Sequence, residues 1–267
     1  MKKIIFALAG VCLLCGSVFS ESKMVLVKGG TFLMGSPSSE RMRDADEAQH
    51  SITVNDFYCD AFEVRQSDYE KLMGENPSYN KGANLPVENV SFYDALEYCN
   101  KKSAAEGLAA VYKIGGKNAK FPDVSVDLTA DGYRLLTEAE WEYACRAGTT
   151  TIFSTGNWNN PKDANYEGIY PYLIEENYVR RTNPNVQPGL NRGKTIAVDS
   201  LAPNAFGLYN MHGNVSEWVF DYYGDYGGSV SASGVAGSLG GKNASGMGGK
   251  SVLNPLGSAV GIYRVNR

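Results

Sequence analysis

Two long stretches without regular periodicity constrain the fold of this 267-residue chain more than any other feature. Residues 149–203 are rich in Asn, Pro, Gly and Tyr, and residues 224–257 hold eleven glycines among many serines and alanines. The first stretch predicts long ordered loops and the second a flexible surface loop. Because ordered loops of this length need a function or an external tie such as a metal ion, the sequence indicates a loop-rich domain.

Short strands and short helices are predicted around these loops, which places the chain in the α+β class. Two of the helices begin with capping boxes, Ser91 with Asp94 and Thr137 with Glu140. The 43% hydrophobic content can fill a substantial core, so residues 21–267 are assigned to one domain. The helices are predicted at residues 66–73, 91–102 and 137–146. Two strands are predicted around a glycine turn within 24–34, and further strands at 52–58, 62–64, 207–209 and 216–220.

Two tryptophans and an arginine are expected to stabilise this framework. Trp141 and Trp218 follow apolar periodicities, which is typical of core anchors. Arg134 lies just before the Thr137 cap and close to a carboxylate-rich helix start. A planar guanidinium in that position favours a bidentate structural pair with a carboxylate.

The first twenty residues have the composition of a secretory signal peptide. Two lysines precede an apolar stretch from Ile4 to Cys15 that is too short to span a bilayer, and small residues lead to a cleavage site before Glu21. A lipid anchor on Cys15 is the alternative, which the bulky Leu14 disfavours. We therefore expect an exported protein of the periplasm or cell surface, without a transmembrane helix in the mature chain.

Charge, cysteine and histidine content argue against several function classes. The formal net charge is −4 and the mature chain has no basic run, so a nucleic-acid partner is not expected. Cys59, Cys99 and Cys145 form no C-x-x-C pair. Cys99 and Cys145 lie on the apolar faces of predicted helices, so we expect them to be small buried hydrophobic residues. His50 and His212 lack the spacing of metal ligands and are expected at the surface or in turns. The sequence has no G-x-S-x-G motif, so a serine hydrolase is not indicated.

Several segments between residues 24 and 218 together resemble the formylglycine-generating enzyme (sulfatase-modifying factor) family, and they occur in the family's order. They are Met24–Ser36, Phe57–Tyr58 with Phe62–Val64, Leu85–Val87 with Val90–Ala95 and Tyr98–Asn100, Tyr133–Ala144, and Asn204–Trp218. The resemblance implies the family's C-type-lectin-like fold, which is loop-rich and has little regular secondary structure.

The segment from Asn210 to Glu217 is the candidate metal site. In a loop that leads into a strand, the carbonyls of Gly213 and Val215 can join the Asn210 amide oxygen and the Glu217 carboxylate in a set of hard oxygen donors suited to Ca²⁺. The residues alone leave an alternative open, in which the asparagines form turns and Glu217 accepts backbone hydrogen bonds. The resemblance favours a structural calcium ion, because family members hold calcium with the matching positions.

A second calcium site of the family is only partly matched. Asn165 and Tyr166 correspond to its start. The carboxylate expected before Asn204 has no clear counterpart, and Asp199 is a poor substitute.

The chain departs from the family's pattern where the active enzymes have their catalytic residues. Those enzymes carry two cysteines near the C-terminus, which bind copper, activate oxygen and oxidise a sulfatase cysteine to formylglycine. Here Tyr263–Arg267 resembles the turn that precedes these cysteines, and no position matches either of them. The resemblance therefore implies that the C-terminal core strands are missing and that the domain is C-terminally incomplete.

Two functions are compatible with these observations. The first is an exported, non-catalytic protein that binds a protein or glycan ligand or acts as a scaffold, in the manner of the variable proteins of diversity-generating retroelements on this fold. The second is a formylglycine-generating oxidase whose catalytic cysteines lie beyond Arg267, with copper bound only in such a longer form.

Overall fold

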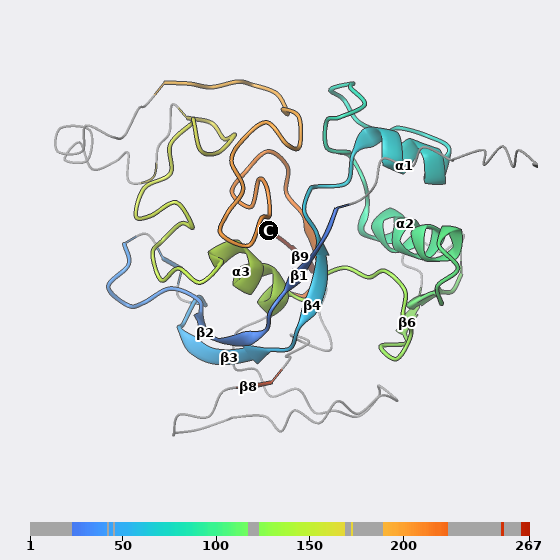
Figure 1. Cartoon of the computed structure of the whole chain (residues 1–267), viewed down its shortest axis with the longest axis horizontal. Helices are drawn as coiled ribbons and strands as arrows, with labels where there is room; N and C mark the ends of the chain where they lie inside the picture. Colours follow the sequence, from blue (N-terminus) through green and yellow to red (C-terminus); the bar gives the residue numbers. More distant parts are fainter. Residues whose placement is uncertain are drawn as a thin grey trace, which may run out of the picture.

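In the computed structural model, the described residues are 23–41, 43–44, 46–116, 123–168, 172, 189–223, 252–253 and 263–267. They form an α+β domain of short elements connected by long loops (Figure 1), as predicted. The helices are α1 (Gln66–Met73), α2 (Phe92–Ala105) and α3 (Glu138–Arg146). The strands are β1 (Met24–Val27), β2 (Gly30–Met34), β3 (His50–Val54), β4 (Phe57–Asp60), β5 (Tyr112–Ile114), β6 (Val124–Val126), β7 (Trp218–Tyr222), β8 (Val252–Leu253) and β9 (Arg264–Asn266).

The described strands pair in four small sheets. They have the orders β1-β4, β2-β3-β8, β5-β6 and β7-β9. The predicted glycine turn does separate β1 from β2, but these strands pair with β4 and β3 instead of with each other. Gly29 permits this arrangement, since a Cβ atom there would lie 2.3 Å from the Val54 carbonyl oxygen.

The helices begin and end where local interactions dictate. Both predicted capping boxes are present, with Ser91 accepting from the Asp94 amide and Thr137 from the Glu140 amide. Helix α1 ends at Gly74 with φ 84°, and α3 ends at Ala147, which also has a left-handed backbone. Helix α2 continues three residues past the predicted end, to Ala105.

The hydrophobic core has two parts. One lies between α3 and the strands β1 to β4, and Figure 1 shows α3 above β2 and β3. The other lies between α2 and β5. Trp218 packs against this second part as predicted and donates from Nε1 to the Val90 carbonyl at 2.9 Å. Trp141 is only half-buried, and its indole Nε1 donates to the Glu217 carboxylate at 2.8 Å.

The predicted arginine pair is confirmed. Arg134 donates from both terminal nitrogens to the two carboxylate oxygens of Glu140, at 2.7 and 2.8 Å. The same carboxylate accepts the backbone N–H of Thr137. One ion pair thus fixes both the approach of the chain to α3 and the N-terminal cap of the helix.

Two predicted strands are wrong. Residues 62–64 form a bend followed by irregular backbone. Residues 207–209 are also irregular, and they begin at Gly207, whose positive φ of 82° lies outside the range of a β-strand. The Asn204 side chain orders this second segment, because its Oδ1 accepts from the amides of Phe206 and Leu208 at 3.0 and 3.2 Å. The predicted strand at 216–220 is β7, which begins two residues later.

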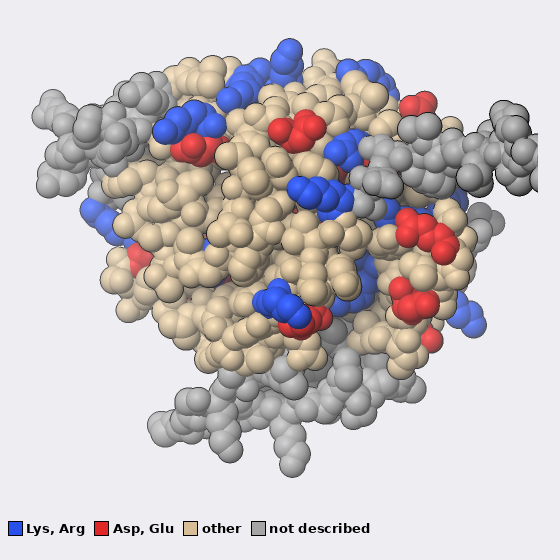
Figure 2. All heavy atoms as spheres, viewed as in Figure 1, with Lys and Arg blue, Asp and Glu red and all other residues tan. Residues whose placement is uncertain are grey.

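The predicted loops of 149–203 consist, in their described parts, of turns, bends and single bridges. The predicted signal peptide at 1–20 lies outside the described residues, as does the predicted loop at 224–257 except for β8, which pairs in parallel with β3. Within the part of the chain that is described, no helix has the length and apolar character needed to cross a membrane. The face in Figure 2 shows acidic and basic side chains interspersed.

Candidate functional site

The segment from Asn210 to Glu217 follows a tightly turned path. Asn210, Gly213 and Asn214 have φ angles of 51°, 97° and 68°. Gly213 lies against Asn165, and a Cβ atom at Gly213 would stand 2.4 Å from the Asn165 carbonyl oxygen. That same carbonyl accepts the Asn214 amide at 2.7 Å. The structure therefore joins two predicted site segments, 165–166 and 210–217, that are distant in the sequence.

Glu63 lies at the centre of this region, although the sequence did not single it out as a site residue. Its Oε2 atom accepts from the side-chain amides of Asn210 at 2.8 Å and Asn214 at 2.9 Å. The backbone N–H of Val215 also donates to this carboxylate. Glu63 is 8% exposed, so these donors replace the water that a surface carboxylate would have.

Asn214 connects Glu63 to two further loops. Its Oδ1 accepts from Asn165 Nδ2 and from the Ile196 amide, both at 2.9 Å. Its Nδ2 donates to Glu63 and to the Ile196 carbonyl at 3.2 Å. Asn165 Nδ2 also donates to the Lys194 carbonyl at 3.0 Å. We call Glu63, Asn165, Asn210, Asn214 and Glu217 the loop cluster.

The loop cluster has an excess of acceptor oxygens. Glu63 Oε1 and Asn210 Oδ1 are buried and have no hydrogen-bond donor. Burial, followed by repulsion from Glu217, raises the pKa of Glu63 to about 8. Burial also raises the pKa of Glu217, against the opposing effect of the Trp141 N–H bond at 2.8 Å. A buried group of this kind favours either protons or a cation.

The remaining predicted ligands have different surroundings. Tyr166 donates from its hydroxyl to the Asn159 carbonyl at 2.8 Å. Asp199 is exposed and accepts from Asn84 at 2.9 Å. Across the described ranges, no group of three or more His, Cys, Asp or Glu residues could hold a metal ion. A cation in the loop cluster would therefore depend on amide and backbone oxygens as well as carboxylates.

The cysteines are poor nucleophiles in this fold. Cys59, Cys99 and Cys145 are unpaired thiols on β4, α2 and α3. Burial raises the pKa of each to about 12. Since the thiolate is the reactive form, these thiols are unreactive at neutral pH. The predicted burial of Cys99 and Cys145 is confirmed.

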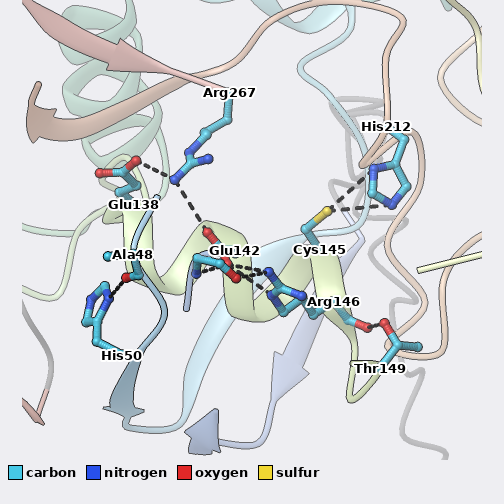
Figure 3. A network of polar contacts seen from close by, with 10 residues as sticks. Ala48, His50, Glu138, Glu142, Cys145, Arg146, Thr149, His212 and Arg267 are labelled. Atoms are coloured by element: carbon cyan, nitrogen blue, oxygen red, sulfur yellow. Dashed lines mark hydrogen bonds and ion pairs between the residues drawn. The ribbon is translucent and has the colours of Figure 1, made fainter. Parts of the chain in front are cut away.

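His212 lies in a bend, which is one of the two positions expected from the sequence, and it is half-buried. Figure 3 shows its ring facing the Cys145 sulfur, which lies 3.8 Å from each ring nitrogen. Its Nε2 accepts the Ser154 amide at 3.0 Å, and burial lowers its pKa to about 4. With a neutral imidazole beside a neutral thiol, this pair has the character of packing and not of an activated nucleophile.

Figure 3 also shows an ion-pair network on α3. Arg146 donates to Glu142 at 2.8 Å and to the Gly35 carbonyl at 2.9 Å, and the Gly35 amide donates back to Glu142. Arg267 pairs with Glu138 and Glu142 on the same helix. These contacts connect α3 to β2 and to the residue after β9, which is a structural role.

The fold and the site define a loop-rich α+β domain that is organised around buried loop contacts. The family described as the sulfatase-modifying factor enzyme 1-like domain (FGE-sulfatase) matches residues 16–265. The chain therefore belongs to the FGE-sulfatase family, in agreement with the resemblance of its sequence blocks.

Relatives in this family carry different names. The chain is 34% identical over 238 residues to the chaperone protein LppX of Paenibacillus barcinonensis, covering 82% of this chain and 79% of LppX. It is 30% identical to the mouse formylglycine-generating enzyme, covering 76% of this chain and 59% of that enzyme. Among solved structures, Treponema denticola variable protein 1 shares the fold with a TM-score of 0.60 and 23% identity, over 91% of this chain and 82% of that one.

The hydrogen bonds of Asn214 predict a large cost for its removal. Asn214→Ala removes the four side-chain hydrogen bonds from Asn214 to Glu63, Asn165 and Ile196, which should lower the free energy of unfolding by at least about 2 kcal/mol. Asn89→Ala is the matched control, because Asn89 also has a positive φ but is exposed and makes one long bond of 3.5 Å. Chemical denaturation measures both variants, and equal losses would contradict the importance of the loop cluster.

Proposed function

We propose that this chain is an exported, non-catalytic ligand-binding or scaffold protein whose FGE-sulfatase domain is stabilised by calcium. The observation that carries the calcium part is the pair of buried oxygens without donors, Glu63 Oε1 and Asn210 Oδ1. The non-catalytic part is supported by the high pKa values and separate locations of the three described thiols.

The loop cluster has the donor chemistry that Ca²⁺ prefers. Asn210 directs its amide nitrogen to Glu63 and to the Val198 carbonyl, which leaves its oxygen available as a ligand. The Glu217 carboxylate and the carbonyls of Gly213 and Val215 would complete the set, while Glu63 supplies further negative charge. A second ion at Asn165 and Tyr166 would lack a carboxylate ligand, so we expect it to bind more weakly.

A binding role agrees with the arrangement of the chain. Long described loops of turns and bends surround a small core, and binding sites often occur on loops that a rigid scaffold positions. On the C-type-lectin-like scaffold that the resemblance implies, these loops would face a protein or glycan ligand. Similarity to LppX, which is named a chaperone, and the signal-like first twenty residues favour a periplasmic or cell-surface location.

Calcium should raise thermal stability, because an ion that binds only the folded state stabilises it by mass action. At about a hundred times Kd the gain is about 2.7 kcal/mol, or a Tm increase of about 5–10 °C for a domain of this size. Differential scanning calorimetry with excess calcium or EGTA measures it.

Glu217→Gln should abolish the calcium-induced increase in Tm. The control variant Glu97→Gln, at a largely exposed side chain on α2, should retain it. The Gln variant preserves the size of the side chain and an acceptor for Trp141, so a lost response would report the missing charge. An unchanged Tm of the unmodified protein between calcium and EGTA would eliminate the calcium proposal.

The competing function is formylglycine generation, the activity for which the mouse relative is named. Because the pKa of each of the three described thiols is raised to about 12, we expect no conversion of a sulfatase-derived cysteine peptide to formylglycine in the presence of copper and oxygen. Mass spectrometry of the peptide gives the readout, with the mouse enzyme as the positive control and copper alone as the blank. Product above the blank would refute the non-catalytic proposal.

A further inference from the structure

An open cavity of about 570 Å³ lies between two loop segments that are distant in the sequence, residues 80–85 and 192–201. The segments meet where the Val198 amide donates to the Asn84 carbonyl at 3.0 Å. The Asn84 side chain also donates to Asp199 at 2.9 Å. The cavity therefore has two walls that contact each other directly.

The first wall is held by a buried glutamine. Gln66 is 1% exposed, and its Nε2 donates to the Asn80 carbonyl at 2.7 Å and to the Pro86 carbonyl at 3.1 Å. Its Oε1 accepts the Gly82 amide at 3.0 Å. Because this side chain bonds the backbone at both ends of the segment, residues 80–86 are held in one conformation.

The second wall is held by the loop cluster. Asn165 Nδ2 donates to the Lys194 carbonyl at 3.0 Å. The Asn214 side chain bonds both the amide and the carbonyl of Ile196. Calcium bound in the loop cluster would therefore preorganise this wall, which lowers the cost of ordering it around a ligand.

The cavity is basic, although the whole chain has a formal net charge of −4. Its described lining contains Lys81, Arg192 and Lys194 and no Asp or Glu. Lys81 donates to the Asn76 carbonyl at 2.5 Å and Arg192 to the Ala164 carbonyl at 3.4 Å, and both acceptors are neutral. In the described part of the chain, the three cations form no ion pair with a carboxylate. Electrostatic complementarity favours an anionic ligand here.

Two carboxylates bond to the walls from outside the lining. Glu88 accepts the Asn80 amide at 2.8 Å, and Asp199 accepts from the Asn84 side chain. Even when both are counted, the cations of the described residues around the cavity outnumber the carboxylates.

The rest of the lining combines polar and apolar side chains. A buried hydroxyl is among them, because Thr195 is 9% exposed and its Oγ1 has no hydrogen-bond partner. A ligand that accepts from this hydroxyl would supply the missing bond. The other polar side chains are Asn80 and Ser200, and the apolar ones are Leu85, Ile196, Ala197 and Leu201.

This lining suits a saccharide better than a free ion or a peptide. A volume of about 570 Å³ is typical of small-molecule sites and exceeds that of a single sulfate ion. Both walls consist of turns, bends and irregular backbone, so an extended peptide finds no strand to pair with. A sugar ring has hydroxyl groups for the polar side chains and a C–H face for the apolar ones.

We propose that this cavity binds an acidic saccharide, with its sulfate or carboxylate group among Lys81, Arg192 and Lys194 and its ring against the apolar lining. The inference rests on the binding role proposed above and gives it a glycan as the ligand.

The probe is a fluorescein-labelled trisulfated heparin disaccharide, and fluorescence anisotropy measures its binding to the full chain with calcium present. We expect saturable binding with a Kd below about 1 mM, which added salt weakens. The uncharged disaccharide N,N′-diacetylchitobiose with the same label should not bind. No saturable binding of the sulfated probe, or equal binding of both probes, would overturn the inference.

A double variant tests whether the two walls form one site. Lys81→Gln combined with Lys194→Gln removes one cation from each wall and should weaken binding about tenfold. The control combines Lys23→Gln with Lys113→Gln, which removes two exposed lysines outside the cavity and should leave the affinity unchanged. Equal affinities of the two double variants would contradict the site.

Thr195→Val separates binding from stability. The variant removes the unpaired hydroxyl and keeps the shape of the side chain, so affinity should fall about threefold while Tm does not decrease. An unchanged affinity with a lower Tm would show a purely structural hydroxyl and overturn its contact with the ligand.

Other ligands give different results. Inorganic sulfate that displaces the probe with a Kd equal to that of the disaccharide would overturn the saccharide in favour of a free oxyanion. A labelled hexaglutamate peptide that binds more tightly than the disaccharide would overturn it in favour of an acidic protein segment.

The inference and the calcium proposal can fail separately. If the disaccharide does not bind while calcium still raises Tm, the glycan inference is wrong and the calcium-stabilised domain stands. If calcium leaves Tm unchanged while the disaccharide still binds, the calcium part of the proposed function is wrong and the glycan inference stands.

Discussion

The buried carboxylate of Glu63 is the contact on which the arrangement of the loops depends. It receives hydrogen bonds from Asn210, Asn214 and the amide of Val215, all from one distant segment. Through Asn214 the same network reaches Ile196 and the loop that carries Asn165. An unpaired buried carboxylate would cost several kcal/mol, so the loops must keep the geometry that satisfies it. Two orphan oxygens in this cluster explain why we expect a cation to complete it.

Local chemistry predicted the regular elements well. The capping boxes fixed the starts of α2 and α3, and Arg134 paired with Glu140 as its position suggested. Strand pairing was harder, because a glycine turn normally joins neighbouring strands, whereas Gly29 here allows a close crossing of two ribbons. The segment 207–209 has the pattern of a strand, but side-chain bonds from Asn204 impose a turn that no hydrophobic pattern reveals.

Prediction of the candidate site depended on resemblance more than on pattern. Asn210, Glu217 and Asn165 were identified in this way, whereas Glu63 was missed because 147 residues separate it from Asn210. Its available signal was a carboxylate between the apolar residues Phe62 and Val64, inside the segment that was wrongly predicted as a strand. Asn214 was treated as a turn former, which its positive φ bears out, but its four side-chain hydrogen bonds could only be found in three dimensions.

Native-state hydrogen exchange of the calcium-loaded protein measures whether the loop cluster is as stable as the core. The amides of Ile196, Asn214 and Val215 report on it, because their acceptors belong to the cluster. We predict opening free energies within about 1 kcal/mol of those of the α3 amides, since the loops should open only with the domain. Exchange of these three amides at the rates of an unstructured loop, while α3 stays protected, would contradict the dependence of the loops on Glu63.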